Sequence, residues 1–231
     1  MSPAMVTITW HGHACFVLEA DGRRVIIDPF LTGNPRADVE AAEVPTLDAI
    51  LLTHGHGDHL GDAVPLAKRD SAIVVAPYEL ARFCAEQGAP NVHPMHIGGA
   101  HAFPFGTVKL VTAIHGGAVE ADGAGPYTTH PCGFVVTMGG TRIYHAGDTA
   151  LTLDMQLLAG RVDVMLCPIG DNYTMGIEDA ARAVDFVKPR LVVPMHWGTF
   201  PVIETDPEEF RRAVGEHARV EVLRPGQSCR C

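Results

Sequence analysis

Short apolar runs separated by turn-forming residues repeat along the chain and predict most of its regular structure. Alternating or β-branched runs predict strands, and apolar residues at helical spacing predict helices. Strands are expected at 6–10, 15–20, 24–27, 49–52, 73–76, 91–97, 107–114, 133–138, 142–145, 162–168, 191–195 and 220–223. Helices are expected at 60–69, 77–87, 151–158, 177–187 and 207–217. This pattern by itself favours an α/β or α+β fold.

Turn residues mark several of these boundaries. Asp21-Gly22 and Gly139-Gly140 predict hairpin turns, and Pro77 and Gly88 bracket the helix between them. The sequence shows no internal repeat, linker or low-complexity tract. We therefore expect a single domain over residues 1–231, with two sheets packed face to face and helices outside them.

One stretch concentrates side chains that are costly to bury. Three histidines and an aspartate, His54, His56, Asp58 and His59, directly follow the apolar run 49–52. Such groups lose free energy on burial unless they find a partner, and imidazole and carboxylate are ligands that zinc takes. The intervening glycines let the backbone curl so that these side chains converge. The stretch predicts a divalent metal site, with a histidine-rich surface loop as the alternative.

Four further polar residues stand at the ends of predicted strands, where loops can gather side chains on one rim. They are Asp28, His115, Asp148 and His196. A single histidine or aspartate at a strand end is more often a cap or a turn residue, so each is weak evidence alone. His145 has two alternatives, the site or the packing between two strands.

The order of these residues resembles the successive motifs of the metallo-β-lactamase superfamily of metal-dependent hydrolases. The first motif, His-x-His-x-Asp-His, is present as His54 to His59, and the resemblance covers residues 6 to about 200. It implies an α+β fold, the four-layer αββα sandwich of that superfamily. It also implies ligands for two ions: His54, His56 and His115 for one, Asp58, His59 and His196 for the other, with Asp148 bridging them. Asp28 would then lie behind the ligands and hold them by hydrogen bonds.

The resemblance also implies the chemistry of a binuclear metal-dependent hydrolase. Two divalent ions, expected to be Zn²⁺ with Mn²⁺, Ni²⁺ or Fe as alternatives, make a bridging water acidic near neutral pH. That hydroxide attacks a small ester, lactone or phosphoester. Asp58 and Asp148 are the expected catalytic residues, since Asp58 could orient the hydroxide and Asp148 would bridge the ions.

A closer branch is suggested by Trp10-His11-Gly12-His13 and by the segment 168–176, Pro-Ile-Gly-Asp-Asn-Tyr-Thr-Met-Gly. Both are similar to the uncharacterised metal-dependent hydrolases that resemble ascorbate-6-phosphate lactonases. The likeness places the 171–175 region near the metal centre, and the loop 118–131 could supply further contacts. The candidate substrate-binding residues are His13, Tyr127, His130, Asn172 and Thr174. The alternative for this segment is a turn followed by a helix cap at Thr174 or Gly176.

The composition of the chain limits the kinds of binding partner and the locations that we expect. The formal net charge of −10 disfavours nucleic-acid binding, which needs Lys and Arg against phosphates. No run approaches the roughly 20 apolar residues of a membrane span, the first residues lack a signal-peptide pattern, and the six cysteines lack framework spacing. We expect a cytoplasmic enzyme with a small-molecule substrate and no nucleic-acid or membrane partner. The resemblance adds a homo-oligomer as an expectation. The alternatives are a phosphodiesterase or nuclease on the same ions, and a non-catalytic metal-binding protein.

Overall fold

The computed structural model describes residues 5–119 and 128–231, and its described strands form two seven-stranded sheets. The first sheet has the order β14 (Ser228–Arg230), β1 (Thr7–Trp10), β2 (Phe16–Ala20), β3 (Arg23–Ile27), β4 (Ala49–Leu51), β5 (Ile73–Pro77) and β6 (Asn91–Met95). The second has the order β13 (Arg219–Val220), β12 (Leu191–Met195), β11 (Val164–Pro168), β10 (Thr141–His145), β9 (Cys132–Met138), β8 (Gly106–Thr112) and β7 (Ala100–Phe103).

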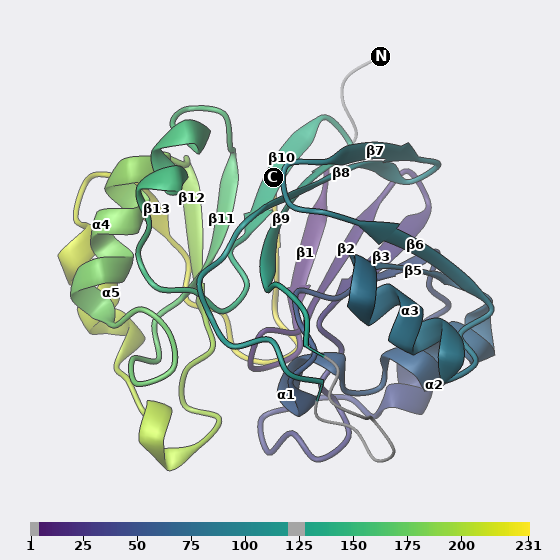
Figure 1. Ribbon diagram of the computed structural model, residues 1–231. Coiled ribbons are helices and arrows are strands. Elements are labelled where there is room, and N and C mark those ends of the chain that lie inside the picture. The colour runs from purple at the N-terminus through teal and green to yellow at the C-terminus, as the bar shows by residue number, and fades with distance from the viewer. Residues whose placement is uncertain (1–4, 120–127) are drawn as a thin grey trace.

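Helices cover the outer faces of both sheets (Figure 1). Helices α2 (Ala63–Asp70) and α3 (Tyr78–Glu86) lie outside the first sheet, and the single-turn α1 (Gly57–Leu60) lies beyond the carboxyl end of β4. Helices α4 (Ile177–Val187) and α5 (Pro207–Val214) lie outside the second sheet. Three short 3-10 helices complete the described structure: η1 (Ala41–Glu43), η2 (Leu153–Leu158) and η3 (Pro201–Ile203). The expected α+β, four-layer αββα sandwich is confirmed.

The central strands are apolar on both faces because each sheet is covered on both sides. In β3, Val25 and Ile27 pack into the core between the sheets, while Ile26 packs under the outer helices. Successive side chains of a strand point to opposite faces, so a strand buried on both sides reads as a continuous apolar run. Trp10 and Phe16 of the first sheet and Phe134 and Tyr144 of the second are fully buried in the inner core.

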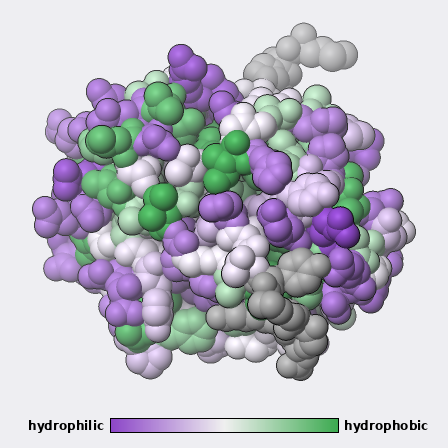
Figure 2. Space-filling model, viewed as in Figure 1, coloured by the Kyte–Doolittle hydropathy of each residue, from purple (hydrophilic) through white to green (hydrophobic). Residues whose placement is uncertain are grey.

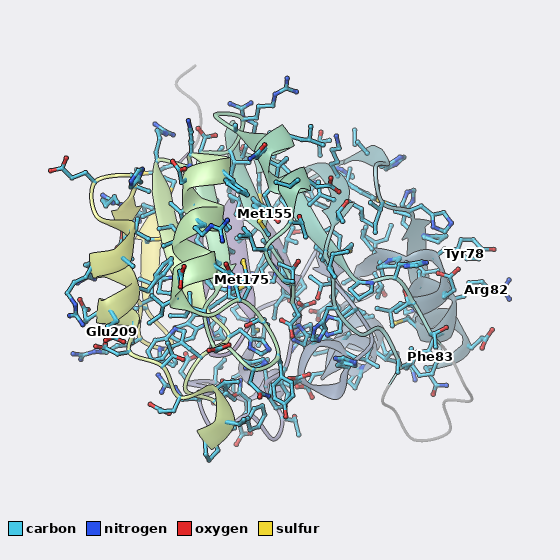
Figure 3. The ribbon with its side chains drawn as sticks, turned by 60° about the vertical axis from the view of Figure 1, so that its left-hand side comes forward. Tyr78, Arg82, Phe83, Met155, Met175 and Glu209 are labelled. Carbon is cyan, nitrogen blue, oxygen red and sulfur yellow. The ribbon has the colours of Figure 1, made fainter. Side chains whose placement is uncertain are left out.

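The outer helices bury one face each. Leu80 and Phe83 of α3 are buried, whereas Tyr78 and Arg82 project outward from the same helix (Figure 3). Beside α4, Met155 and Met175 fill the core with 2% of each residue exposed (Figure 3). Hydrophobic residues also reach the surface near α4 and η2 (Figure 2), where Leu153 and Leu157 are each 73% exposed.

Strand directions bring one set of strand ends together. In the first sheet, β1 runs in the same direction as the parallel pair β3 and β4. In the second, β8 and β12 run in the same direction as β10. The loops after these six strands therefore leave the carboxyl end of each sheet, which is where candidate ligands follow in the sequence.

Some predicted boundaries are wrong. The helix expected at 60–69 begins only at Ala63, because Gly61, with a φ of 39°, ends the preceding α1 at Leu60. The helix expected at 151–158 is the 3-10 helix η2, and the last predicted strand shortens to Arg219–Val220. Strands β7 and β14 were not predicted.

No helix in the described ranges is long and apolar enough to cross a membrane.

His145 links the two sheets and is not available to a metal. Its Nε2–H donates to the carbonyl oxygen of Ala14 at 2.9 Å, and its Nδ1 accepts from the Gly147 amide at 3.2 Å. The residue has no exposed surface, and burial lowers its pKa below the usual 6.5. The packing role is therefore the correct alternative for this residue.

The lowered pKa of His145 predicts a pH-dependent contribution to stability. Below pH 6.5 the unfolded chain takes up the proton more readily, so the free energy of unfolding falls as the pH drops and levels off below the folded pKa. His145→Gln should remove this contribution and cost about 1–3 kcal/mol at pH 8 through imperfect replacement of two buried hydrogen bonds. Denaturant unfolding of the chelator-treated protein at pH 8 and pH 5 measures both effects. Parallel pH profiles for the variant and the parent would contradict this reading.

Candidate metal centre

Loops after six strands and the short helix α1 supply all the residues of the centre. Because carboxyl ends of strands meet on one rim, residues far apart in sequence become neighbours. His13 follows β1, Asp28 follows β3, His54 and His56 follow β4, Asp58 and His59 lie on α1, His115 follows β8, Asp148 follows β10 and His196 follows β12.

The side chains form overlapping groups with the spacing of metal ligands. One group is His54, His56 and His115, and another is His13, Asp58, His59 and His196. A third group joins His54, His59 and Asp148. Within each group, one nitrogen or oxygen per residue lies within 4.8 Å of the others. All seven predicted ligands are thus brought together in the arrangement that the superfamily resemblance implies.

One carboxylate oxygen of Asp148 lies where the groups meet. Its Oδ2 is 3.3 Å from Nε2 of His59, 3.4 Å from Nε2 of His115 and 2.9 Å from Nε2 of His196. The Asp148 side chain is only 3% exposed. A single buried anion therefore contacts one histidine of the first group and two of the second.

Buried polar atoms at this position lack hydrogen-bond partners. Nε2 of His59, Nε2 of His196 and Oδ1 of Asp148 have no aligned partner among the described residues. The short distances to Asp148 are consistent with this, because closeness without alignment is not a hydrogen bond. Leaving such atoms unpaired is costly, and a cation among them would satisfy nitrogen lone pairs and carboxylate together. The donor set therefore fits a divalent metal.

Asp28 orients two of the ligand-bearing residues from beneath. Its Oδ1 accepts from the Thr53 amide at 2.8 Å, and its Oδ2 accepts from the Thr53 hydroxyl at 2.6 Å and from Nδ1–H of His59 at 2.8 Å. Because the Thr53 hydroxyl donates to Asp28, Nδ1–H of His54 donates to Thr53 Oγ1 at 3.0 Å. Both imidazoles therefore turn Nε2 toward the centre, as ligands held by outer hydrogen bonds do.

His13 has no exposed surface and belongs to the second group. Its Nδ1 is 2.8 Å from the Thr199 hydroxyl, and its Nε2 is 3.1 Å from Oδ2 of Asp58. Its ring centroid is 4.0 Å from that of His196. Burial first, and then the neighbouring His196, lower the pKa of His13 to about 4, so the ring is neutral. This burial favours a role in holding Asp58 or an ion over direct contact with a substrate.

The pKa shifts of most residues in the centre favour the protonation states that bind a cation. Burial raises the pKa of Asp148 and of Asp58, but neighbouring histidines outweigh it, so both carboxyl pKa values lie below their usual range. Burial and neighbouring imidazoles lower the pKa values of His54 and His115. Burial also lowers that of His59, but Asp148 and Asp28 outweigh it and raise the pKa. Ionised carboxylates and neutral imidazoles are the forms that bind metals.

Unusual backbone geometry accompanies these contacts. His13, Asp28 and His196 have φ values of 53°, 46° and 55°. Non-glycine residues seldom adopt this left-handed region, and such conformations concentrate at functional sites. Gly55 is required for a different reason, because an added Cβ would lie 2.8 Å from Cγ2 of Val119.

A cavity of about 620 Å³ opens onto the centre. It is lined by Phe30, His56, Gly57, Asp58, His115, Asp148, Tyr173, His196, Phe200 and Val202. Among the predicted substrate contacts, His130 is exposed and does not line it, nor do Asn172 and Thr174. Tyr127 lies outside the described residues. The sequence reasoning missed Phe30, Tyr173, Phe200 and Val202, although Tyr173 lies inside the segment that it singled out.

Comparison with known proteins agrees with this architecture. The model of the Beta-lactamase superfamily domain matches residues 7–196, and the chain therefore belongs to the metallo-β-lactamase superfamily, as its sequence pattern indicates. It is 50% identical over 225 residues to a UPF0173 metal-dependent hydrolase of Bacillus cereus strain G9842, covering 96% of this chain and 98% of that one. It is 55% identical over 207 residues to the UPF0173 metal-dependent hydrolase of Bacillus cytotoxicus, covering 88% of this chain and 90% of that one.

A solved structure shows the same fold. Igni18, a metallo hydrolase from the archaeon Ignicoccus hospitalis, is 33% identical with a TM-score of 0.89, and the match covers 98% of both chains. Together with the curated relatives, this similarity makes the chain a metal-dependent hydrolase.

Removing one acceptor from Asp28 should loosen the centre without removing a ligand. We expect Asp28→Asn to lower metal affinity about 10- to 100-fold, because the amide keeps one acceptor oxygen and turns an NH2 donor toward a donor of Thr53 or His59. Competition with a chromophoric chelator measures the affinity. Asp48→Asn is a matched control, since Asp48 accepts from the Arg24 amide at 2.8 Å and is not among the groups of possible metal ligands. Equal affinity in Asp28→Asn and the parent would exclude this role.

Proposed function

We propose that the protein is a binuclear hydrolase that uses two divalent ions to cleave a small ester, lactone or phosphoester. The observation that carries this proposal is the position of Asp148, whose Oδ2 lies within 3.4 Å of histidines from both ligand groups. A carboxylate shared by two groups supports two neighbouring ions better than one. The relatives named metal-dependent hydrolases support the reaction class.

The residues divide between the two ions as the groups suggest. His54, His56 and His115 would hold one ion. Asp58, His59 and His196 would hold the other, with His13 beside them as a further candidate. Asp148 would be common to both. Nitrogen and oxygen donors in this number favour zinc, while manganese, nickel and iron accept the same ligands.

Bound divalent ions would supply Lewis acidity toward a substrate oxygen and toward water. The chain's own residues would position the reactants. Asp58 lines the cavity with 28% of its side chain exposed, and its carboxylate can accept a hydrogen bond from a water molecule. His13 holds that carboxylate through its Oδ2. Asp148, whose carboxyl pKa lies below its usual range, would stay ionised and offset part of the charge of the ions.

We also propose the domain organisation, location and assembly that the sequence predicts. A single domain over 1–231, a cytoplasmic location and a homo-oligomer rest on the sequence and the resemblance. No observation on the described residues favours the nuclease or the non-catalytic alternative, and the net charge of −10 continues to disfavour nucleic acid as a substrate.

Replacing Asp148 tests the proposal. Asp148→Ala should lower bound metal from two ions per chain and reduce kcat/KM at least 100-fold, because it removes the shared ligand. Metal content by mass spectrometry and turnover of small lactones, esters and a generic phosphodiester are the readouts. Asp154→Ala, at an exposed acid of η2, is the matched control. Full metal content and full activity in Asp148→Ala would refute the assignment.

A further inference from the structure

The mouth of the metal cavity is built from apolar side chains. Phe30 follows β3, Tyr173 follows β11, and Phe200 and Val202 follow β12. The ring centroids of Phe30 and Phe200 are 6.4 Å apart, and each lies 5.8 Å from the ring of His13 beneath them. Three separate loops thus contribute apolar side chains to the lining of one cavity beside the ligand groups, and these four residues are called the apolar wall.

Part of this wall faces water. Tyr173 is 55% exposed and Val202 is 52% exposed. Large apolar side chains are commonly left exposed at binding sites, where a ligand covers them and gains the free energy of removing apolar surface from water. A cavity of about 620 Å³ is of the size that holds a small molecule.

The described lining of the same cavity has no lysine or arginine side chain. Its ionised side chains are the carboxylates Asp58 and Asp148. Arg36 lies near the loop after β12, but it is stacked on the Trp197 ring at 4.9 Å and does not line the cavity.

A phosphorylated substrate would need a positively charged group beside any phosphate that is not at the cleaved bond. Proteins usually supply that partner as arginine or lysine. Here the ions could take the reacting group, but a second anionic group would face phenyl rings and carboxylates. An uncharged aryl or alkyl group would instead cover the exposed wall.

We infer that the substrate is an uncharged carboxylic ester or lactone whose aryl or alkyl group packs against Phe30, Tyr173, Phe200 and Val202. This inference rests on the proposed hydrolase function and narrows it, excluding phosphorylated sugar lactones. In the reaction, the oxygen of water bonds to the carbonyl carbon and the bond from that carbon to the alcohol oxygen breaks. One proton of the water passes to the alcohol oxygen, leaving an alcohol and a carboxylic acid.

Three lactones that differ in one substituent test the inference on the metal-loaded protein. They are γ-butyrolactone, γ-phenyl-γ-butyrolactone and a γ-phosphoryloxymethyl analogue. We expect kcat/KM for the phenyl lactone to exceed that for the unsubstituted lactone at least tenfold, given the apolar area that a phenyl group covers. The phosphorylated lactone should be no better than the unsubstituted one. Equal values for the first two, or preference for the phosphorylated lactone, would overturn the inference.

Variants of the exposed wall residues test whether these residues cause the preference for the phenyl lactone. The double variant Tyr173→Ser, Val202→Ser should lower the ratio of phenyl to unsubstituted kcat/KM about tenfold, and Tyr173→Phe should preserve it. Leu153→Ser is the matched control, because Leu153 is an exposed apolar residue that does not line this cavity. A ratio that the double variant leaves unchanged would contradict the proposed contact.

Binding without turnover separates this inference from the proposed function. Calorimetry should show 4-phenylbutyrate binding at least tenfold more tightly than butyrate, since the two share a carboxylate and differ in the phenyl group. That preference without lactone turnover would support the apolar site and count against the hydrolase proposal for these substrates. Turnover without any phenyl preference in binding or catalysis would support the hydrolase and overturn the apolar site.

Discussion

The buried carboxylate of Asp28 is the constraint on which the metal centre depends. An anion without exposed surface is expensive unless donors surround it, and the Thr53 amide, the Thr53 hydroxyl and His59 supply three. These hydrogen bonds connect the end of β3 to the loop after β4 and to α1. They also set which nitrogens of His54 and His59 point toward the other ligands. The ligand positions therefore follow from satisfying one buried charge.

The fold explains why the other ligands arrive at the same place. Six strands from both sheets end at one rim, and the chain turns sharply there through the left-handed residues His13, Asp28 and His196. The two ligand groups then share the buried Asp148, so charge in one group affects the other. His54 and His59, which follow a strand of the first sheet, lie beside the same carboxylate as His196, which follows a strand of the second sheet. The centre and the sandwich are thus mutually dependent.

Much of this could be predicted from the sequence because strand-end histidines and aspartates stand out against apolar runs. His54, Asp148 and His196 were identifiable in this way, and strand bounds such as Leu191–Met195 agree with the structure. Edge strands were harder to predict from the sequence. β7 has mostly exposed residues and β14 is only three residues long, so neither carries a strong apolar pattern. In β14, Cys229 is nevertheless buried. The apolar wall was missed because Phe30 and Phe200 in loops look like ordinary core residues until the loops are placed.

The central claim is that two ions lie between the two ligand groups with Asp148 in contact with both. Anomalous X-ray diffraction from crystals of the zinc-loaded protein tests it most directly. The account predicts two zinc peaks, one enclosed by His54, His56 and His115 and the other by Asp58, His59 and His196, with Asp148 touching both. A single peak, or peaks bound by other residues, would contradict it.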